Sequence, residues 1–230
     1  MERGLMMSDQ FIRNYQARDL PAVRTIYGDD EFARPDLLRK YPRMEEYLTD
    51  EVTHYYIHFE PESVFVAEMQ GKIVGALLGA VNTSRREHFY ASRVKPYLLT
   101  RCLSGAYGWP AWYQAILRTD LAGRGVQPPP VDLTQYPAHL HIGLLPDWRR
   151  KGIGTALMAA FADYLHSKGI PGYHLYVSSF HPLGLAFYRK LGLDDLGQIN
   201  WRFHTGYKWI TVTEFVFGEK IAALHENSFH

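Results

Sequence analysis

Apolar and polar positions alternate along several short segments of the chain, and a period of two predicts β-strands. We expect strands at the start of residues 11–28, in a hairpin over residues 63–81, and at 139–146, 173–178 and 208–217. Gln70 and Gly71 form the predicted hairpin turn, and the second hairpin strand carries Gly75 and Gly79. Glycine inside a strand marks a place where another backbone, side chain or ligand comes close.

Apolar positions three or four residues apart predict the helices of the first half of the chain. One helix starts at Asp19, a good N-cap residue, has Pro21 in its first turn and ends at Gly28. Residues 29–59 are charged and contain two prolines, so we expect one or two short surface helices there.

Two later helices have clear start and stop residues. An apolar stripe follows Gly154 and ends at Lys168 and Gly169, a cation in the last turn and then a glycine cap. The second helix begins at Pro182 and ends at Gly192.

The order of these elements predicts an α/β fold, in which helices flank a mixed sheet with at least one right-handed parallel crossover. The pattern loosens after residue 82, and residues 83–135 hold one or two helices and a run of prolines. Because this stretch is too short for a core of its own, we interpret it as an insertion within a single domain over residues 1–230. Residues 1–10 are expected to be a flexible tail.

Charge and composition exclude several partners. The net charge is +1, so no global field attracts nucleic acid or an anionic membrane. The longest apolar run, residues 73–81, is far shorter than a membrane span, and the first ten residues have no signal-peptide core. Cys102 is the single cysteine, which indicates a reducing compartment and predicts a cytoplasmic protein. We expect a monomer or a homodimer.

The sequence PDWRRKGIGTALM, residues 146–158, joins a predicted strand to a helix. The first N–H groups of a helix lack internal partners, and Gly152 and Gly154 allow backbone N–H groups to approach a phosphate. Arg149, Arg150 and Lys151 add positive charge. The loop is neither a Walker loop nor a dinucleotide fingerprint. By physical chemistry alone it is either a phosphate-binding loop or a tight turn with a solvated basic rim.

Two histidines share one face of the strand that precedes this loop. His139, His141 and Gly143 point to one side, and Leu140, Ile142 and Leu144 point to the other. Histidine suits general-base work near neutral pH, so both are candidate catalytic residues; the alternative is ordinary strand histidines with bonded rings. A metal site is rejected, because no third ligand is placed beside the pair.

The loop resembles motif A of the GNAT acetyltransferases, usually written Q/R-x-x-G-x-G/A. The segment HPLGLAFYRKLGL, residues 181–193, is similar to a later helix of that family. A narrower resemblance links residues 61–84, the insertion and YPAHLHI to the acetyltransferase-like C-terminal domain of O-GlcNAc hydrolases and its free-standing bacterial relatives. The animal domains look to have lost the glycine loop, which this chain keeps.

The family resemblance implies a GNAT-like, mostly antiparallel sheet and acetyl-CoA as co-substrate, with no metal. It also implies that Tyr188 contacts the thioester sulfur and that His181 is either a helix-cap residue or a coenzyme contact. The strand position that often carries an acid is Gly143 here, which removes an obvious general base. The implied coenzyme contacts are Leu144, Leu145, Arg149, Arg150, Lys151, Gly152, Ile153, Gly154, Thr155, His181 and Tyr188.

These features predict an N-acetyltransferase that passes an acetyl group from acetyl-CoA to an unidentified small-molecule or peptide amine by direct attack. An alternative keeps coenzyme binding without catalysis, as a regulatory or scaffold module. A third, a pure interaction domain that works through the aromatic insertion, needs no phosphate loop and is disfavoured.

Overall fold

The computed structural model describes residues 10–28, 44–108, 129–204 and 209–221. These residues form a seven-stranded sheet with strand order β1-β2-β3-β4-β5-β7-β6, in which β4 and β5 are the parallel pair and the other neighbours are antiparallel. The predicted mixed, mostly antiparallel sheet is confirmed. Its strands are β1 (Gln10–Asn14), β2 (Val64–Met69), β3 (Lys72–Ala80), β4 (Ala138–Leu144), β5 (Gly172–Ser178), β6 (Asp194–His204) and β7 (Trp209–Lys220).

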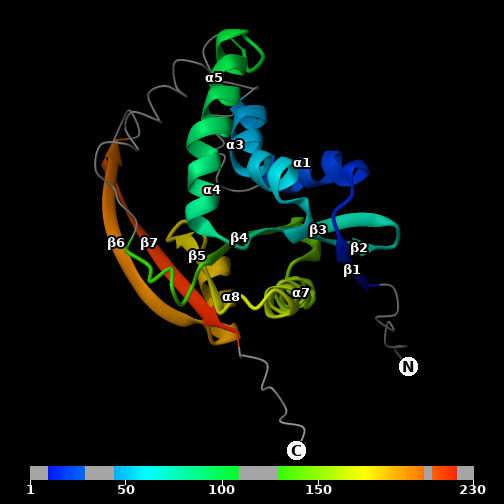
Figure 1. Ribbon diagram of the computed structural model, residues 1–230, viewed down its shortest axis with the longest axis vertical. Helices are drawn as coiled ribbons and strands as arrows, with labels where there is room; N and C mark the ends of the chain where they lie inside the picture. The colour runs from blue at the N-terminus through cyan, green and yellow to red at the C-terminus, as the bar shows by residue number, and fades with distance from the viewer. Residues whose placement is uncertain (1–9, 29–43, 109–128, 205–208, 222–230) are drawn as a thin grey trace, which may run out of the picture.

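Helices cover both faces of the sheet, as Figure 1 shows edge-on. The upper layer in that view contains α1 (Leu20–Gly28), α3 (Met44–Phe59), α4 (Thr83–Phe89) and α5 (Lys95–Leu103). The lower layer contains α7 (Ile153–Ser167) and α8 (Pro182–Leu191). Each layer packs on its own apolar cluster, so the sheet separates two cores.

The hairpin of β2 and β3 forms as the alternation of apolar and polar residues predicts. β2 and β3 pair through a turn at Gln70 and Gly71, whose φ values of 51° and 74° are left-handed. A Cβ at Gly79 would lie 2.2 Å from the Phe161 ring and 2.6 Å from the Ser63 carbonyl oxygen. Because Gly79 has no side chain, the Phe161 ring of α7 can pack closely against β3.

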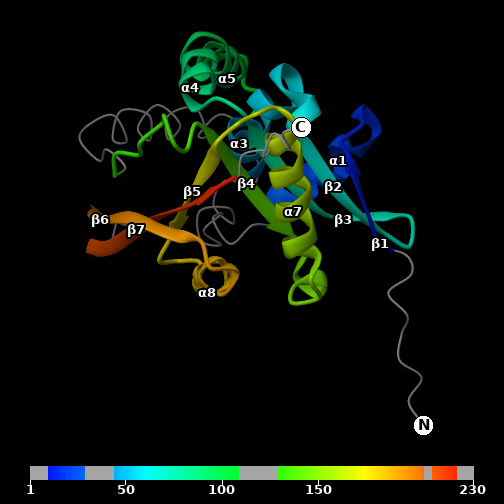
Figure 2. The ribbon, with the colours of Figure 1, turned by 60° about the horizontal axis from the view of Figure 1, so that its bottom comes forward.

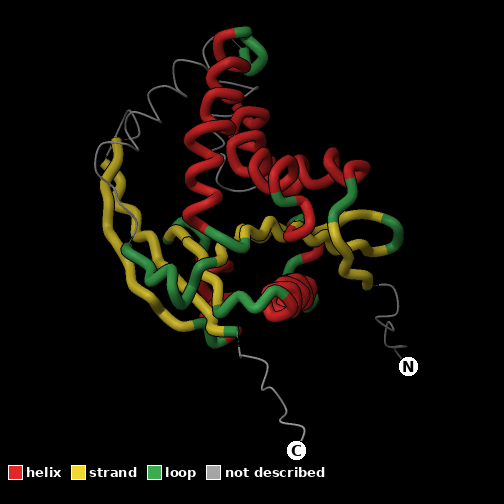
Figure 3. Tube along the Cα trace, viewed as in Figure 1, coloured by secondary structure: helices red, strands yellow, loops and turns green. Residues whose placement is uncertain are grey.

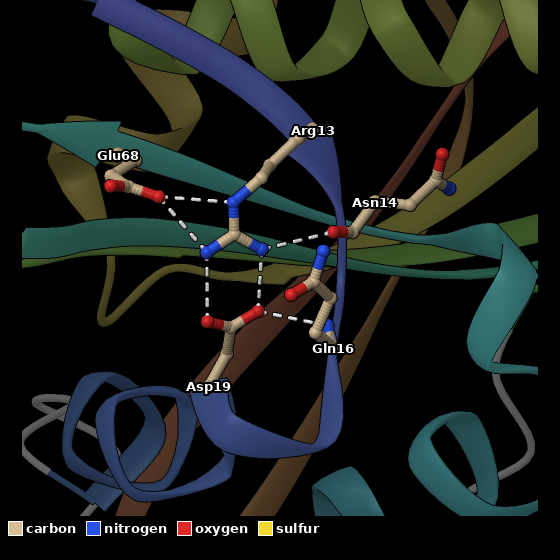
Figure 4. Close-up of polar contacts among 5 residues, drawn as sticks. All are labelled: Arg13, Asn14, Gln16, Asp19 and Glu68. Atoms are coloured by element: carbon tan, nitrogen blue, oxygen red, sulfur yellow. Dashed lines mark hydrogen bonds and ion pairs between the residues drawn. The ribbon is translucent and has the colours of Figure 1, made fainter. Parts of the chain in front are cut away.

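The start of α1 is held by charge rather than by a simple cap. Asp19 belongs to a 3-10 turn (Ala17–Asp19) and accepts the Gln16 N–H. Its carboxylate also accepts two hydrogen bonds from Arg13, at 2.6 and 2.8 Å, and Arg13 donates to Glu68 at 3.0 Å (Figure 4). Burial opposes ionisation, but the bonds from Arg13 dominate and lower the pKa of Asp19. This bridge ties β1 and β2 to the first helix.

Two predictions about the elements are wrong. Residues 44–59 form one helix of 16 residues whose tyrosines are buried in the core, not a short surface helix. A strand, β6, was missed between α8 and the final strand, although Ile199, Trp201 and Phe203 alternate there. It pairs with β7 along its length, and the two form the long curved ribbon at the left of Figure 1.

The first part of the insertion is a helical rod. A π-helical turn (Tyr90–Val94) joins α4 to α5, and the rod stands beside α3 in Figure 3. Asp50 of α3 is 4% exposed and anchors the rod. It accepts the Tyr107 hydroxyl at 2.6 Å and pairs with Arg24 and Arg101. The rest of the insertion up to residue 128, including its Trp109, lies outside the described residues.

Candidate functional site: the fork between β4 and β5

The two parallel strands separate soon after they meet. β4 and β5 pair only at Ala138 with Tyr173 and at His139 with His174. From there β4 stays bonded to β3, whereas β5 stays bonded to β7 (Figure 2). The edges of β4 and β5 beyond His139 and His174 therefore face a fork, whose polar backbone groups have no strand partner across it.

The two faces of the fork differ. Below it, Leu140 and Leu175 belong to an apolar cluster with Phe161 and Tyr188. Above it, the His139 ring lies 4.8 Å from the ring of His141 and 5.2 Å from that of His174. The predicted alternation of β4 is confirmed, with its histidines on one side and its leucines on the other.

The glycine loop leaves a row of backbone N–H groups unbonded. Gly152 has φ 81° and Arg150 φ 62°, and both are left-handed turns. The first helical N–H of α7 with a partner belongs to Ala156, which donates to Gly152 at 3.0 Å. None of the N–H groups of residues 150–155 donates to another described residue. Together with the helix dipole, this row of N–H groups is suited to hold an anion, and it is called the cradle below.

The two glycines of the loop have different roles. A Cβ on Gly152 would meet nothing within 4 Å, so this residue opens the cradle and supplies the left-handed turn. A Cβ on Gly154 would lie 3.1 Å from the Phe187 ring and 3.6 Å from Leu144. Gly154 therefore lets the start of α7 approach α8 and the end of β4. Ile153 is 1% exposed and anchors the loop in the core, and Thr155 is exposed beside it.

The basic side chains of the loop are arranged unequally. Arg149 donates from Nε to the Leu144 carbonyl at 3.2 Å, so part of its guanidinium holds the loop against β4. Lys151 lies 4.7 Å above the Trp148 ring, and Arg150 and Lys151 are both exposed. Arg150 and Lys151 are therefore exposed cations beside the cradle, whereas Arg149 holds the loop against β4.

The backbone N–H and carbonyl groups of Leu145 are both bonded within the chain. Its N–H donates to the Val74 carbonyl at 2.9 Å, and its own carbonyl accepts the Trp148 N–H at 2.9 Å. Leu145 therefore has no N–H to offer a ligand. Successive strand residues point their backbone groups in opposite directions, so Leu144 and Ile142 face the fork instead.

Tyr188 lies on the lower face of the fork. It is 7% exposed, and its ring is 6.0 Å from that of Phe217. His181 occupies the N-cap position of α8, as one reading predicts, but its side chain makes no capping bond. Gly192 ends the helix with φ 79°, as predicted.

The candidate bases lie in surroundings that weaken them. His139 is 3% exposed, and its Nδ1 is 3.2 Å from the Tyr56 hydroxyl. Burial, followed by the charge of Arg86, lowers the pKa of His141 to about 3 and holds that of His139 well below its usual range. Both rings are therefore neutral at physiological pH and accept a proton only weakly.

Packing against α1 explains why Gly143 occupies the strand position that often carries an acid in the family. A Cβ on Gly143 would lie 2.8 Å from the Ile26 side chain of α1. The Tyr27 hydroxyl, on the same helix, is 3.1 Å from the His141 carbonyl. α1 therefore occupies the space that a carboxylate side chain at position 143 would need.

Sequence reasoning missed four residues of the upper face, namely Tyr56, Arg86, His174 and Tyr176. His174 alternates with Leu175 in a strand pattern that was recognised, so its face was predictable. Tyr56 and Arg86 come from helices far along the chain, and no local pattern links them to β4. Across the described residues, no group of three or more His, Cys, Asp or Glu side chains is arranged to hold a metal ion.

Comparison with known proteins agrees with this geometry. Residues 122–192 match the family model of the acetyltransferase (GNAT) domain. An acetyltransferase of Pectobacterium atrosepticum is 22% identical over 188 residues, which cover 82% of this chain and 90% of that protein.

Solved structures share the fold. The crystal structure of SsHAT has a TM-score of 0.68 at 27% identity and covers 93% of this chain and 99% of its own. An N-acetyltransferase from Staphylococcus aureus Mu50 has a TM-score of 0.55 at 16% identity over 94% of this chain and 100% of its own. The structure of yncA from Salmonella typhimurium with acetyl-CoA has a TM-score of 0.56 at 14% identity, over 94% and 95%.

Residues 122–192 are therefore similar to the acetyltransferase (GNAT) domain, and the chain as a whole shares the fold of solved acetyltransferase structures. The narrower resemblance to O-GlcNAc hydrolase domains stays a prediction. Among the described helices, none has the length and apolar character that a bilayer crossing demands.

Proposed function

We propose that this protein transfers an acetyl group from acetyl-CoA to an amine, by direct attack of the amine on the thioester. The observation that carries the proposal is the unbonded row of N–H groups over residues 150–155, placed at the mouth of the fork. Pyrophosphate oxygens match such a row, and the exposed Arg150 and Lys151 add charge beside it.

The remaining coenzyme contacts follow from the loop. Gly152, Ile153 and Gly154 offer backbone N–H groups to the pyrophosphate, and Thr155 adds its N–H or hydroxyl. The pantetheine arm lies along the free edge of β4 at Leu144. Because Leu145 is bonded to Val74 and Trp148, its role is side-chain contact only. Arg149 and His181 border this path from the loop and from the start of α8.

The transfer step divides the work between the two faces of the fork. The amine lone pair attacks the thioester carbonyl, the C–S bond breaks and the sulfur leaves as a thiolate. An unshifted thiol titrates near ~8.5 and an unshifted tyrosine near ~10, so a hydrogen bond from Tyr188 is a better role than full proton donation. A fork-facing N–H of β4, at Ile142 or Leu144, supports the oxyanion.

The amine proton leaves on the upper face. His141 is half-buried and reaches the surface, whereas His139 is buried and bonded to Tyr56. We assign proton acceptance to His141, with His139 as its inner neighbour. Because the proton of an attacking amine becomes strongly acidic in the tetrahedral intermediate, a weak base is adequate for this step.

Two observations favour the non-catalytic alternative, a coenzyme-binding regulatory module. The family acid is absent at Gly143, and the two candidate bases have lowered pKa values. Such a module would bind acetyl-CoA through the same loop without turning it over.

Acetyl transfer separates the two functions. Release of free CoA thiol is measured with acetyl-CoA and a panel of primary amines, together with mass analysis of each amine product. The proposal predicts acetylated product with wild-type protein and at least about tenfold less with Tyr188→Phe. Coenzyme binding without any acetylated product across the panel would instead assign the regulatory role.

A further inference from the structure

The upper face of the fork carries a polar cluster that acetyl transfer by itself does not explain. It consists of Tyr56, Arg86, His139, His141, His174 and Tyr176. These side chains come from α3, α4, β4 and β5. They surround the point at which the β4–β5 pairing ends, on the side opposite Tyr188.

Arg86 is a cation without a counter-charge. Its guanidinium lies 5.6 Å from the centre of the Tyr56 ring, and its Nε is inaccessible to solvent with no hydrogen-bond partner. No described carboxylate forms an ion pair with it, whereas Arg13, Arg24 and Arg101 each pair with an aspartate. Arg86 is half-buried and its Nε is cut off from solvent, so an oxyanion at the guanidinium would supply both an acceptor and a counter-charge.

His174 gives a second, independent sign of a ligand. Its Nδ1 is 2.8 Å from the Tyr136 carbonyl, so this nitrogen carries the ring proton and donates. The other nitrogen, Nε2, is then an acceptor, and it has no partner although the residue is 0% exposed. The ring lies 5.5 Å from that of Tyr176, within the cluster.

The side chains of the cluster differ in their exposure to solvent. Arg86, His141 and Tyr176 are half-buried, whereas His139 and His174 are buried behind them. α4 is the first helix of the insertion, so the insertion supplies the cation of this face. If the anionic group of an acceptor binds Arg86 from the solvent, the atoms of the acceptor next to that group lie at the fork.

We propose that the upper face binds the acceptor, and that the acceptor is an amine with an oxyanion, a carboxylate or a phosphate, close to the amino group. The inference rests on the proposed acetyl transfer and names its substrate class. Arg86 pairs with the oxyanion, and Nε2 of His174 accepts an N–H of the acceptor, directly or through one water. The bonds that form and break in the transfer are those given above.

The test uses matched amines that differ only in the anion. Each of several amino acids is compared with its amide and its decarboxylated amine, and phosphoethanolamine with ethanolamine. We expect kcat/KM to be about 10- to 100-fold higher for the anionic member, the range of a hydrogen bond to a charged group. The two sets distinguish a carboxylate from a phosphate. Equal rates within each pair would overturn the inference.

Variants assign the preference to one residue. Arg86→Gln should bring the ratio of kcat/KM between the anionic and the neutral amine of each pair close to one, whereas Arg86→Lys should retain part of the preference. Arg85→Gln is the matched control, because Arg85 is exposed on the same helix. Melting curves confirm that each variant folds. A preference that survives in folded Arg86→Gln contradicts the inference and leaves acetyl transfer intact.

Binding without turnover separates this inference from the proposed function. Calorimetry titrates the anionic amines into wild type and Arg86→Gln, each saturated with CoA. Binding that only Arg86→Gln loses supports the inference even if no amine is acetylated. The inference is overturned if the wild type neither binds nor acetylates any anionic amine. Binding of acetyl-CoA is measured in a separate titration, so this outcome leaves coenzyme binding untouched.

Discussion

The two faces of β4 at the fork are adjacent in sequence and opposite in chemistry. Leu140 points down into a packed apolar cluster and is 1% exposed. His141, the next residue, points up towards Tyr56 and Arg86 and is half-buried. One face is filled by the protein itself, whereas on the other face Nε of Arg86 and Nε2 of His174 have no hydrogen-bond partner among the described residues.

The two faces therefore differ in what a transferase requires of them, which is rigid positioning on the lower face and substrate binding on the upper face. The lower face needs rigidity, because it fixes the start of α7 and the Tyr188 ring relative to the fork. The upper face needs unsatisfied polar groups, because a substrate has to satisfy them. Substitutions on the lower face should therefore reduce stability, and those on the upper face should reduce activity with little loss of stability.

The largest expected effect is on stability, at the lower face. Leu140→Ala should lower the free energy of unfolding by about 2–5 kcal/mol, because it leaves a cavity among fully buried side chains. His141→Ala, one residue away, should lower it by less than about 1 kcal/mol. Urea unfolding followed by circular dichroism measures both. Similar losses for the two variants would refute the division between the faces.

The second effect is on turnover. Tyr188→Phe removes the hydroxyl that is assigned to the thiolate and keeps the ring in its cluster. A hydrogen bond to a charged group is worth about 1.5–3 kcal/mol, so kcat should fall about 10- to 150-fold. The Kd of acetyl-CoA should not change. Tyr164→Phe on α7 serves as the control, and unchanged kcat in Tyr188→Phe would remove that residue from the step.

The third effect is on the pH dependence of stability. The pKa of His141 falls from its ordinary 6.5 to about 3 on folding, so below pH 6.5 the unfolded chain binds more protons. Stability should therefore fall as the pH drops from 6.5 towards 3. His141→Asn should flatten this slope by at most about 1.4 kcal/mol per pH unit. Parallel curves for wild type and variant would show that His141 is not buried as a neutral ring.

The sequence revealed the lower face and the loop because both are written in local patterns. Leucines at alternate positions, the strand-to-helix change at Gly152 and the cap at Gly192 depend only on neighbours within a few residues. β6 was missed although its alternation was present, since its residues follow directly after α8.

The upper face depends on contacts between distant segments. Tyr56 and His139 are 83 residues apart along the chain, yet their polar atoms are 3.2 Å apart. The lowered pKa values arise from burial by α3 and α4, which no strand pattern reveals. Gly143 was read as a missing acid, but only the packing of α1 shows that a Cβ at this position would clash with Ile26.

The central claim is that the loop at the start of α7 binds the pyrophosphate of acetyl-CoA. Gly152 and Gly169 lie at opposite ends of α7, both left-handed with φ 81° and 67°, and a Cβ on either meets nothing within 4 Å. Glutamate therefore imposes similar backbone strain at the two positions, but only at Gly152 does it bring negative charge to the cradle.

Calorimetry with acetyl-CoA should be carried out on the wild type, Gly152→Glu and Gly169→Glu. We predict micromolar binding, roughly −8 kcal/mol, for the wild type and Gly169→Glu, and no detectable binding for folded Gly152→Glu. Equal binding by all three proteins, or none by the folded wild type, would contradict the claim.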